Sequence, residues 1–310
     1  MQNDMDSSIN NSSHFKAGYV AIIGEPNVGK STLMNCILDQ KISAVTAKPQ
    51  TTRHRIVGIL SNEQSQIIFL DTPGLLKARY RLHEAMMKSA FSALKDADIV
   101  LLILDASDRN IIKEFNQHIA RSALEKLTRP IFLLLNKIDL VDEKTLALLS
   151  STFAKRDRFS EVLPTSGLRS TGLENVLACI RQYLPAHPPF YPLDIVSEHP
   201  ERFFVSELIR EKIFEQFEDE IPYSTTVEII DFKEQKGRKD LISAEIYVER
   251  DSQKGILIGR QGSALKKIGE QARHDIELFL QRPVYLELHI KVRNKWRDNP
   301  RLLKQLGYTP

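Results

Sequence analysis

The chain of 310 residues has two cysteines and no long apolar segment. Cys36 and Cys179 fall in segments that we expect to be helical, which favours packed thiols in a reducing compartment. The longest uninterrupted aliphatic run, residues 99–104, is far shorter than the roughly 20 residues of a membrane-spanning helix. Residues 1–16 are rich in Ser and Asn and lack the apolar core of a signal peptide, so we expect them to be disordered. These absences predict a soluble, cytoplasmic protein.

The composition is that of a folded protein with more than one domain. Apolar residues make up 42% of the chain and charged residues 27%, and 310 residues suit two domains. Apolar segments of strand length lie near residues 18–23, 66–71, 98–104, 131–136 and 161–165, and amphipathic segments lie near 82–96, 109–127, 143–156 and 171–183. Their alternation predicts an α/β domain over residues 17–184, with a mostly parallel sheet and helices on both faces.

A different pattern follows residue 184. Residues 185–200 contain five prolines and predict a semi-rigid linker rather than a packed element. Beyond the linker, residues 201–310 are predicted to form a second, α+β domain with the element order αββααβ. The expected elements are a helix over 203–217, strands over 225–234 and 241–249, a short and a long helix around Gly259, and a strand over 284–292.

One glycine-containing loop carries the strongest functional signal. Gly24-Glu25-Pro26-Asn27-Val28-Gly29-Lys30-Ser31 matches the phosphate-binding pattern GxxxxGK[ST], between an apolar strand and a segment from Thr32 to Gln40 that is typical of a helix. In such a loop the backbone N–H groups surround the phosphates of a nucleotide, the lysine reaches the β- and γ-phosphates, and the Ser hydroxyl ligates Mg²⁺. The loop therefore indicates a nucleoside triphosphate site.

Two later motifs identify the base and complete the site. Asp71-Thr72-Pro73-Gly74 follows a buried strand, so the Asp71 carboxylate is expected to hold Mg²⁺ through water and the Gly74 N–H to face the γ-phosphate. The second motif, Asn136-Lys137-Ile138-Asp139, follows another buried strand. There Asp139 can accept hydrogen bonds from guanine N1–H and its exocyclic amine, while the base stacks along Lys137 and Asn136 braces the loop. Adenine lacks that pair of donors, so the order of motifs predicts a GTPase.

These residues resemble the translation-factor-like class of GTPases. The resemblance places a fifth, guanine-reading element at Thr165-Ser166-Gly167-Leu168 and a switch I threonine in Gln50-Thr51-Thr52-Arg53-His54. We favour Thr52 over Thr51 as the Mg²⁺ ligand, because related subfamilies share the threonine directly before arginine; the alternative is that both residues only open a strand. The expected nucleotide-binding residues are Gly24, Glu25, Pro26, Asn27, Val28, Gly29, Lys30, Ser31, Thr32, Asp71, Gly74, Asn136, Lys137, Asp139, Ser166 and Gly167, with Ser31, Thr52 and Asp71 at Mg²⁺.

The predicted reaction is attack of water on the γ-phosphate of GTP, giving GDP and phosphate. Lys30, Thr52 and Gly74 are the expected catalytic residues, because they face the charge that develops on the transferred group. Leu75 occupies the position of the water-orienting glutamine of Ras-like proteins, and leucine cannot polarise water, so we expect slow intrinsic hydrolysis. Asn27 resembles an asparagine that helps to hold K⁺ in several members of the class. This predicts activation by K⁺; the alternative is an asparagine that merely suits a turn.

The second domain resembles a type II KH domain, in which a GxxG turn between two helices contacts the backbone of four nucleotides. Residues 201–249 carry 7 basic and 13 acidic side chains, whereas residues 250–304 carry 13 and 6. Positive charge thus gathers around the GxxG turn and after the last strand, which favours RNA binding over a merely solvated face. Trp296 either stacks on a base or caps the core. The expected RNA-binding residues are Lys254, Ile258, Gly259, Arg260, Gln261, Gly262, Lys266, Lys267, Arg293, Lys295 and Trp296.

A GTPase domain joined through a proline-rich linker to a type II KH domain resembles the Era family over residues 17–310. The resemblance implies a monomer that binds the 3′ end of 16S rRNA, assists maturation of the 30S ribosomal subunit, and associates peripherally with the inner membrane surface. GTP binding would favour the RNA-competent arrangement, and hydrolysis would end it. Two alternatives are a GTPase that partners an RNA-modifying enzyme and an RNA-binding scaffold that has lost turnover; intact Lys30, Ser31, Thr52 and Asp71 oppose the latter.

Overall fold

The computed structural model describes residues 15–117 and 121–308, which form two compact units. Unit 1 holds the described residues of 15–42, 54–77 and 87–198, and unit 2 holds 43–53, 78–86 and 199–308. The predicted disorder of residues 1–16 lies outside the described residues except at its last two positions, and Lys16 already begins a strand. Within the described part of the chain, no helix is both long and apolar enough to cross a membrane.

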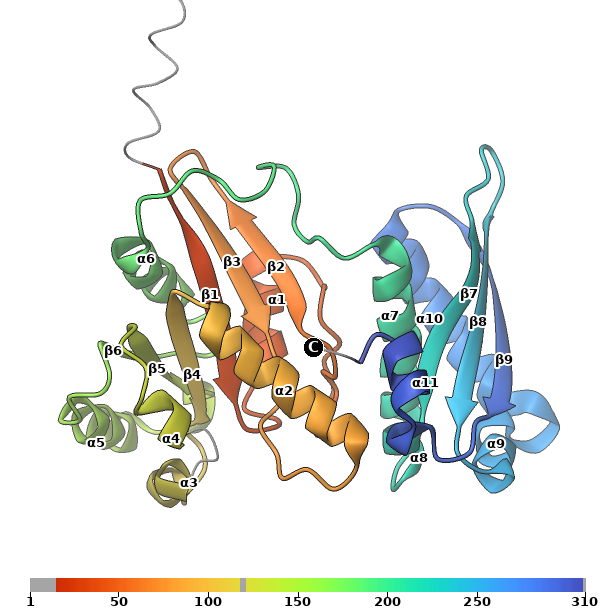
Figure 1. Cartoon of the computed structure of the whole chain (residues 1–310), viewed down its shortest axis with the longest axis horizontal. Coiled ribbons are helices and arrows are strands. Elements are labelled where there is room, and N and C mark those ends of the chain that lie inside the picture. Colours follow the sequence, from red (N-terminus) through yellow and green to blue (C-terminus); the bar gives the residue numbers. More distant parts are fainter. Residues whose placement is uncertain (1–14, 118–120, 309–310) are drawn as a thin grey trace, which may run out of the picture. The chain divides into compact units, whose positions relative to one another are not determined.

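Unit 1 is built on a six-stranded sheet in the order β2-β3-β1-β4-β5-β6 (Figure 1). All neighbouring strands pair in parallel except β2 and β3, which are antiparallel. The strands are β1 (Lys16–Gly24), β2 (Ile56–Ser61), β3 (Ser65–Asp71), β4 (Ile99–Asp105), β5 (Ile131–Asn136) and β6 (Glu161–Pro164). The central strands are buried along almost their whole length, because helices cover both faces. The predicted α/β fold is confirmed.

The helices of unit 1 occupy both faces of this sheet. They are α1 (Lys30–Leu38), α2 (Arg81–Asp96, of which residues 87–96 belong to unit 1), α3 (Ile111–Gln117), α4 (Arg121–Leu124), the 3₁₀ turn η1 (Ile138–Leu140), α5 (Glu143–Ala154) and α6 (Leu173–Tyr183). Figure 1 shows α2 in front of the sheet and α1 behind it. Ala90 of α2 and Phe153 of α5 share one core with alternate strand residues such as Ile23 and Leu102. The predicted helix near 109–127 is described as α3 and α4, and residues 118–120 lie outside the described part.

The proline-rich segment is packed against unit 1, which differs from the predicted unpacked linker. The buried Gln66 side chain accepts hydrogen bonds from the backbone N–H groups of Phe190 (2.8 Å) and Tyr191 (3.0 Å) and donates to the Tyr191 carbonyl (2.9 Å). Ile59 in the edge strand β2 donates its N–H to the Val196 carbonyl at 2.7 Å. The residues between the prolines retain backbone donors and acceptors, so the segment can be bound by a sheet edge despite its prolines. Unit 1 therefore extends to residue 198.

Unit 2 contains a three-stranded sheet in the order β7-β8-β9. β7 is antiparallel to β8, and β8 is parallel to β9. Its elements are α7 (Glu201–Gln216), α8 (Ile221–Ser224), β7 (Thr226–Lys233), β8 (Asp240–Val248), α9 (Asp251–Ile258), the 3₁₀ turn η2 (Arg260–Gly262), α10 (Ser263–Leu280), β9 (Val284–Val292), the 3₁₀ turn η3 (Trp296–Asp298) and α11 (Pro300–Gln305). The order αββααβ is confirmed, with α8, η3 and α11 added.

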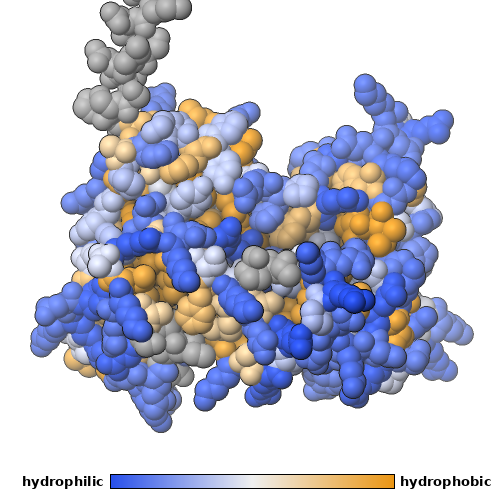
Figure 2. All heavy atoms as spheres, viewed as in Figure 1, coloured by the Kyte–Doolittle hydropathy of each residue, from blue (hydrophilic) through white to orange (hydrophobic). Residues whose placement is uncertain are grey.

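Alternating strand residues build the core of unit 2. Ile242, Ala244 and Ile246 of β8 lie on one face of the sheet and pack with Ile209 of α7 and Ile276 of α10. The opposite face carries the intervening residues, as expected for strands with one buried face. On the side seen in Figure 2, both units are covered mainly by hydrophilic side chains with scattered hydrophobic patches.

Candidate nucleotide site and candidate RNA interface

The predicted phosphate loop connects the end of β1 to the start of α1, at the carboxyl edge of the sheet where ligands of α/β folds bind. Gly24 and Gly29 have positive φ angles, of 156° and 98°. A Cβ atom at Gly24 would lie 2.5 Å from the Ile103 carbonyl oxygen, and one at Gly29 would lie 2.4 Å from Nδ2 of Asn136. Both positions therefore need glycine for conformation and for space.

Lys30 is buried at the start of α1 and points back toward the loop. Its ammonium group donates hydrogen bonds to the carbonyls of Gly24 (3.2 Å) and Glu25 (2.8 Å). Burial lowers the pKa of Lys30 to about 8, although the nearby charges of Asp71 and Glu25 oppose this shift. The loop thus holds one buried cation among its own carbonyl oxygens.

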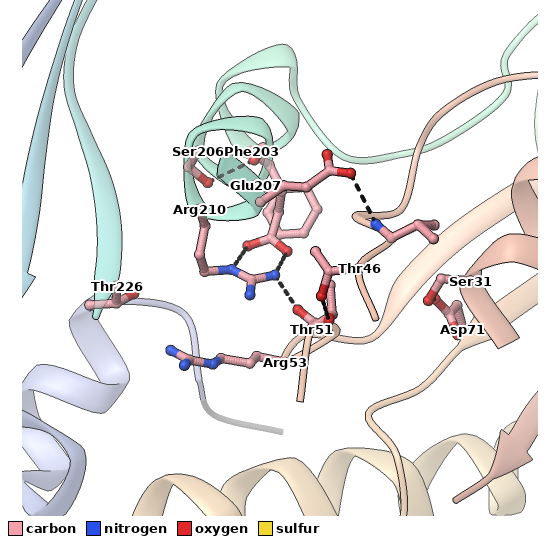
Figure 3. A network of polar contacts seen from close by, with 12 residues as sticks. Ser31, Thr46, Thr51, Arg53, Asp71, Phe203, Ser206, Glu207, Arg210 and Thr226 are labelled. Carbon is pink, nitrogen blue, oxygen red and sulfur yellow. Dashed lines mark hydrogen bonds and ion pairs between the residues drawn. The ribbon is translucent and has the colours of Figure 1, made fainter. Parts of the chain in front are cut away.

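Ser31 and Asp71 lie side by side, as the metal-site prediction requires (Figure 3). The Ser31 hydroxyl donates to Oδ2 of the fully buried Asp71 at 2.8 Å. A hydroxyl and one carboxylate fit Mg²⁺, which prefers oxygen ligands and usually keeps waters and substrate phosphates in its shell. The described residues contain no group of three or more His, Cys, Asp or Glu side chains that could bind a metal by themselves. The donor set therefore fits a metal ion bound together with a nucleotide.

The Asp-Thr-Pro-Gly segment packs directly on the phosphate loop. The Thr72 hydroxyl donates to the Ile22 carbonyl of β1 at 2.8 Å, and the Leu75 N–H donates to the Gly24 carbonyl at 3.1 Å. A Cβ atom at Gly74 would lie 2.9 Å from the Pro26 nitrogen, so this backbone approach also depends on glycine. The Leu75 side chain is buried in the core of unit 1, which agrees with the expectation that it does not orient water.

Asn136 joins the three segments of the predicted base site. Its Nδ2 donates to the Val28 carbonyl in the phosphate loop at 2.7 Å, and its Oδ1 accepts the Gly167 N–H at 3.1 Å. The Ser166 hydroxyl donates to Oδ1 of Asp139 at 2.5 Å. The structure therefore brings together the phosphate loop, the Asn-Lys-Ile-Asp motif and the Thr-Ser-Gly-Leu segment.

Sequence reasoning missed one residue of this cluster. Oδ2 of Asp105 accepts a hydrogen bond from Nζ of Lys137 at 2.6 Å, which forms an ion pair. The usable signal in the sequence was an aspartate directly after the apolar run of residues 99–104. Parallel pairing of β4 and β5 aligns Asp105 with Asn136, so the two strand ends meet.

The predicted switch I motif spans residues 50–54. Its first four residues belong to the segment 43–53 of unit 2, which we call the switch I segment, whereas His54 belongs to unit 1. The buried Arg210 side chain of α7 forms an ion pair with Glu207 and donates to the Thr51 carbonyl (Figure 3). Lys48 donates to the Phe214 carbonyl near the end of α7 at 2.6 Å. Thr52 is buried in the same segment, and its coordination of Mg²⁺ stays a prediction.

Arg53 binds the end of the 43–53 segment to other residues of unit 2. Its guanidinium is buried and donates to the carbonyls of Thr225 (2.7 Å) and Pro222 (2.9 Å). Residues 78–86 also belong to unit 2, where the Arg297 guanidinium lies 4.5 Å from the centre of the Tyr80 ring. Residues 43–53 and 78–86, which lie before and after the Asp-Thr-Pro-Gly motif in the sequence, are therefore structural parts of unit 2.

The GxxG turn lies between α9 and α10, as predicted. Gly259 has a φ of 73°, and a Cβ atom there would lie 2.6 Å from Cβ of Ala264. Gln261 also adopts a positive φ, and Gly262 caps α10. The side chains of Arg260, Gln261, Lys266 and Lys267 are exposed, and those of Lys254 and Ile258 are partly buried. A glycine-dependent turn with exposed cations suits contact with a phosphate backbone.

Trp296 corrects the predicted RNA interface. The side chain is fully buried, its Nε1 donates to the Ser224 carbonyl at 2.8 Å, and its ring stacks on Tyr308 at 6.0 Å between centroids. An indole with no exposed face and a satisfied N–H cannot stack on a base, so Trp296 caps the core of unit 2. The neighbouring Arg293 and Lys295 are exposed.

The sequence interpretation also overlooked the free edge of β9. Among the described strands, β9 pairs only with β8, so its other edge presents backbone donors and acceptors. Tyr285 on β9 is 54% exposed, and Ile256 of α9 is 50% exposed. Both add apolar surface to a unit that was predicted to bind RNA mainly through charge.

The fold and the site define a P-loop GTPase joined to a KH domain. Residues 19–137 match the family described as 50S ribosome-binding GTPase, and residues 220–297 match the KH domain family. The GTPase Era of Geobacter metallireducens is 46% identical over 298 residues, covering 95% of this chain and 98% of the relative. The chloroplastic ERA-like GTPase of Arabidopsis thaliana is 46% identical over 95% of this chain and 69% of the relative. The chain belongs to the Era family of GTPases.

Solved structures support the same assignment. A crystal structure of Era in complex with MgGDPNP and nucleotides 1506–1542 of 16S ribosomal RNA has a TM-score of 0.89, with 37% identity over 96% of this chain and all of that one. A single-residue variant of Aquifex aeolicus Era bound to GDP·AlF₄⁻ has a TM-score of 0.88, with 36% identity over 96% of this chain and all of that one.

Proposed function

We propose that this GTPase is a switch that binds the 3′-end region of small-subunit 16S rRNA through its KH unit and assists assembly of the 30S subunit. The observation that carries the proposal is the presence of both sites in one chain, a phosphate loop with Ser31 and Asp71 in unit 1 and a GxxG turn with exposed cations in unit 2. The relative that was crystallised with MgGDPNP and 16S nucleotides 1506–1542 supports the choice of RNA.

The nucleotide is assigned to the residues that the structure gathers around the phosphate loop. The backbone of Gly24 to Ser31 surrounds the phosphates, and Lys30 stabilises charge on the β- and γ-phosphates. Ser31 and Asp71 would hold Mg²⁺, Asp71 through water, and Thr52 would join them in the GTP state. When bound, the metal would neutralise charge on the phosphate oxygens. Asp139 selects guanine, and Ser166 holds its carboxylate in place at 2.5 Å.

Hydrolysis is proposed to be slow and to depend on a monovalent cation. Leu75 is buried, so its side chain leaves the attacking water without a protein partner at that position. Asn27 is exposed in the phosphate loop with a φ of 66°, which supports the proposal that it helps to bind K⁺ beside the phosphates. Turnover in K⁺ is expected to exceed turnover in Na⁺ at equal ionic strength; equal rates would remove this part of the proposal.

Nucleotide state is proposed to control RNA binding through the switch I segment. Residues 43–53 contain Thr52, which is expected to respond to the γ-phosphate, yet they pack within unit 2 through Arg53, Lys48 and Arg210. A change in this segment would therefore act on the unit that carries the GxxG turn. We expect GTP to favour RNA binding and hydrolysis to end it.

The cellular setting is also a proposal. We place the protein in the cytoplasm as a monomer, with a peripheral contact at the inner membrane surface through the basic residues near the GxxG turn. Flotation with anionic vesicles tests the contact. Binding should fall with rising salt, because screening weakens attraction between exposed charges and lipid headgroups; absence of binding at low salt would exclude it.

Crosslinking in cells tests the RNA assignment. The protein is loaded with a non-hydrolysable GTP analogue or with GDP and crosslinked to cellular RNA, and the fragments are sequenced. We expect fragments from the 3′ end of 16S rRNA, enriched with the GTP analogue. Fragments scattered without regard to ribosomal RNA, or recovered equally with both nucleotides, would refute the proposal. A Lys30→Ala variant serves as the control that cannot respond to nucleotide.

A further inference from the structure

An ion pair outside the recognised motifs joins two neighbouring strand ends of unit 1. Asp105 is the last residue of β4, and its Oδ2 lies 2.6 Å from Nζ of Lys137, which directly follows β5. The Asp105 and Lys137 side chains are 23% and 32% exposed, respectively. A partly sheltered pair is less screened by water than an exposed one, so it constrains its partners more strongly.

The Asp105 carboxylate is itself fixed. Its other oxygen, Oδ1, accepts hydrogen bonds from the Ser107 N–H at 2.9 Å and the Ser107 hydroxyl at 2.6 Å. Burial works to raise the pKa of Asp105, but hydrogen bonds from Lys137 and Ser107 outweigh it and lower the pKa below its usual value. Asp105 is thus an ionised group whose two oxygens have separate, defined partners.

The sheet register places this carboxylate beside Lys137. β4 and β5 pair in parallel with Asp105 opposite Asn136, and the Ala106 N–H donates to the Asn136 carbonyl at 2.8 Å. Lys137 has a φ of 66° and begins the turn that leads to Asp139. A lysine side chain loses much rotamer freedom when it is ordered, so a partner that orders it in advance removes that cost from ligand binding.

We propose that Asp105 is a positioning residue for the guanine nucleotide, because it holds the Lys137 side chain in place before the base stacks along it. The inference rests on the proposed role of Lys137 in base binding. A simple electrostatic model makes the opposite prediction. In that model the Asp105 charge only repels the nucleotide phosphates, so removal of the charge tightens nucleotide binding. The two ideas predict changes of opposite sign in nucleotide affinity.

Equilibrium and dissociation measurements with a fluorescent GDP separate these ideas in the full chain. Asp105→Asn should weaken GDP binding about tenfold, mostly through faster dissociation, because the side chain of Lys137 must then be ordered by the ligand. The ratio of affinities for GDP and inosine diphosphate should stay unchanged, since Asp139 reads the exocyclic amine that inosine lacks. Glu125→Gln, which breaks the exposed Arg121–Glu125 pair of 2.9 Å in the same unit, should leave the affinity unchanged.

A double-mutant cycle distinguishes positioning from a general structural effect. Lys137→Met keeps most of the apolar stem and removes the ammonium group, so adding Asp105→Asn to it should change GDP affinity less than about twofold. Wild-type affinity or tighter binding in Asp105→Asn, or losses that add in the double variant, would overturn the inference. A wild-type protein that binds no guanine nucleotide would instead overturn the proposed function.

Discussion

The two sites of this chain are built in different ways. The nucleotide site of unit 1 consists of buried groups held by short contacts between distant segments, such as Asn136 to Val28 at 2.7 Å and Ser31 to Asp71 at 2.8 Å. The candidate RNA site of unit 2 consists of exposed cations around a turn whose shape depends on Gly259. A small, highly charged ligand that must be read atom by atom needs the first kind of site, whereas a flexible polymer can be bound by the second.

This difference predicts how each site fails. A substitution in the nucleotide site should remove a group that the ligand cannot replace, so a single change should be severe. In the RNA site the shape of the turn should matter more than any one cation, because neighbouring lysines and arginines share the phosphate contacts.

Lys30→Ala should have the largest effect. We expect GTP turnover to fall at least about 100-fold, because a preorganised cation facing the phosphates is lost. RNA affinity measured without nucleotide should be unchanged, since Lys30 belongs to unit 1. Phosphate release and filter binding give the two readouts. Turnover within about threefold of the wild type would contradict the assigned role of Lys30.

Gly259→Ala should impair RNA binding and spare GTP turnover, which is the opposite of the effect of Lys30→Ala. The new Cβ atom would lie 2.6 Å from Cβ of Ala264 at a φ of 73°, so the turn must change shape. We expect RNA affinity to fall at least about tenfold while intrinsic GTP turnover stays the same. Gly255→Ala is a matched control, because a Cβ atom at Gly255 meets nothing within 4 Å. Equal RNA affinity in the two variants would exclude the turn as the binding element.

The affinity for GDP should depend on pH above the pKa of Lys30, which is about 8. Bound phosphates require the ammonium form, so above pH 8 binding must take up a proton, and affinity should fall by up to about tenfold per pH unit. Between about pH 7 and pH 8 the lysine is already largely charged and the terminal phosphate of GDP is still ionised, so the affinity should change little. Titration calorimetry in buffers of different ionisation enthalpy measures the proton uptake. Lys30→Arg serves as the control, because arginine stays charged throughout; the same slope in that variant would assign the effect to another group.

Arg210→Met should reduce communication between the sites by a smaller factor. The substitution removes the donor to the Thr51 carbonyl and the buried ion pair with Glu207, and it leaves an apolar side chain of similar length. We expect the ratio of RNA affinities with GTP analogue and GDP to fall to within about twofold of unity, while GDP affinity alone changes little. Lys212→Met on the same helix breaks pairs with Glu215 and Asp275 instead and should keep the ratio. An unchanged ratio in Arg210→Met would exclude this contact as the link.

Gln66→Leu should have the most local effect. Loss of the hydrogen bonds to the backbone of residues 190 and 191 should cost about 1–3 kcal/mol and release the proline-rich segment. Hydrogen exchange and limited proteolysis should then report faster exchange and cleavage within residues 185–198, with the GTP site unchanged. Protection equal to that of the wild type would show that the segment is held by other contacts.

Much of the nucleotide site could be predicted because each motif is short and lies where a buried strand ends. Gly24, Ser31, Asp71 and Asn136 need no tertiary information beyond the rule that parallel strands place their carboxyl ends together. The contact of Asp105 with Lys137 could not be predicted, because it depends on the lateral pairing of β4 with β5, which a single aspartate in the sequence does not reveal.

The features that sequence reasoning misjudged all depend on long-range packing. Proline content suggested an unpacked linker, but Gln66, more than 120 residues earlier, binds its backbone. Trp296 had two plausible roles, and only the position of Ser224 and Tyr308 decides between them. Residues 43–53 belong to unit 2 because the buried Arg53 and Arg210 side chains donate to backbone carbonyls. Every residue has a carbonyl, so the sequence does not indicate which carbonyls these arginines bind.

The most direct test of the account is equilibrium binding of an RNA fragment from the 3′ end of 16S rRNA to the full chain, loaded either with a non-hydrolysable GTP analogue and Mg²⁺ or with GDP. We predict binding at least about tenfold tighter in the GTP-analogue state, with the difference lost in Lys30→Ala. Equal affinities in the two nucleotide states, or no preference for this RNA over an unrelated fragment of the same length, would contradict the account.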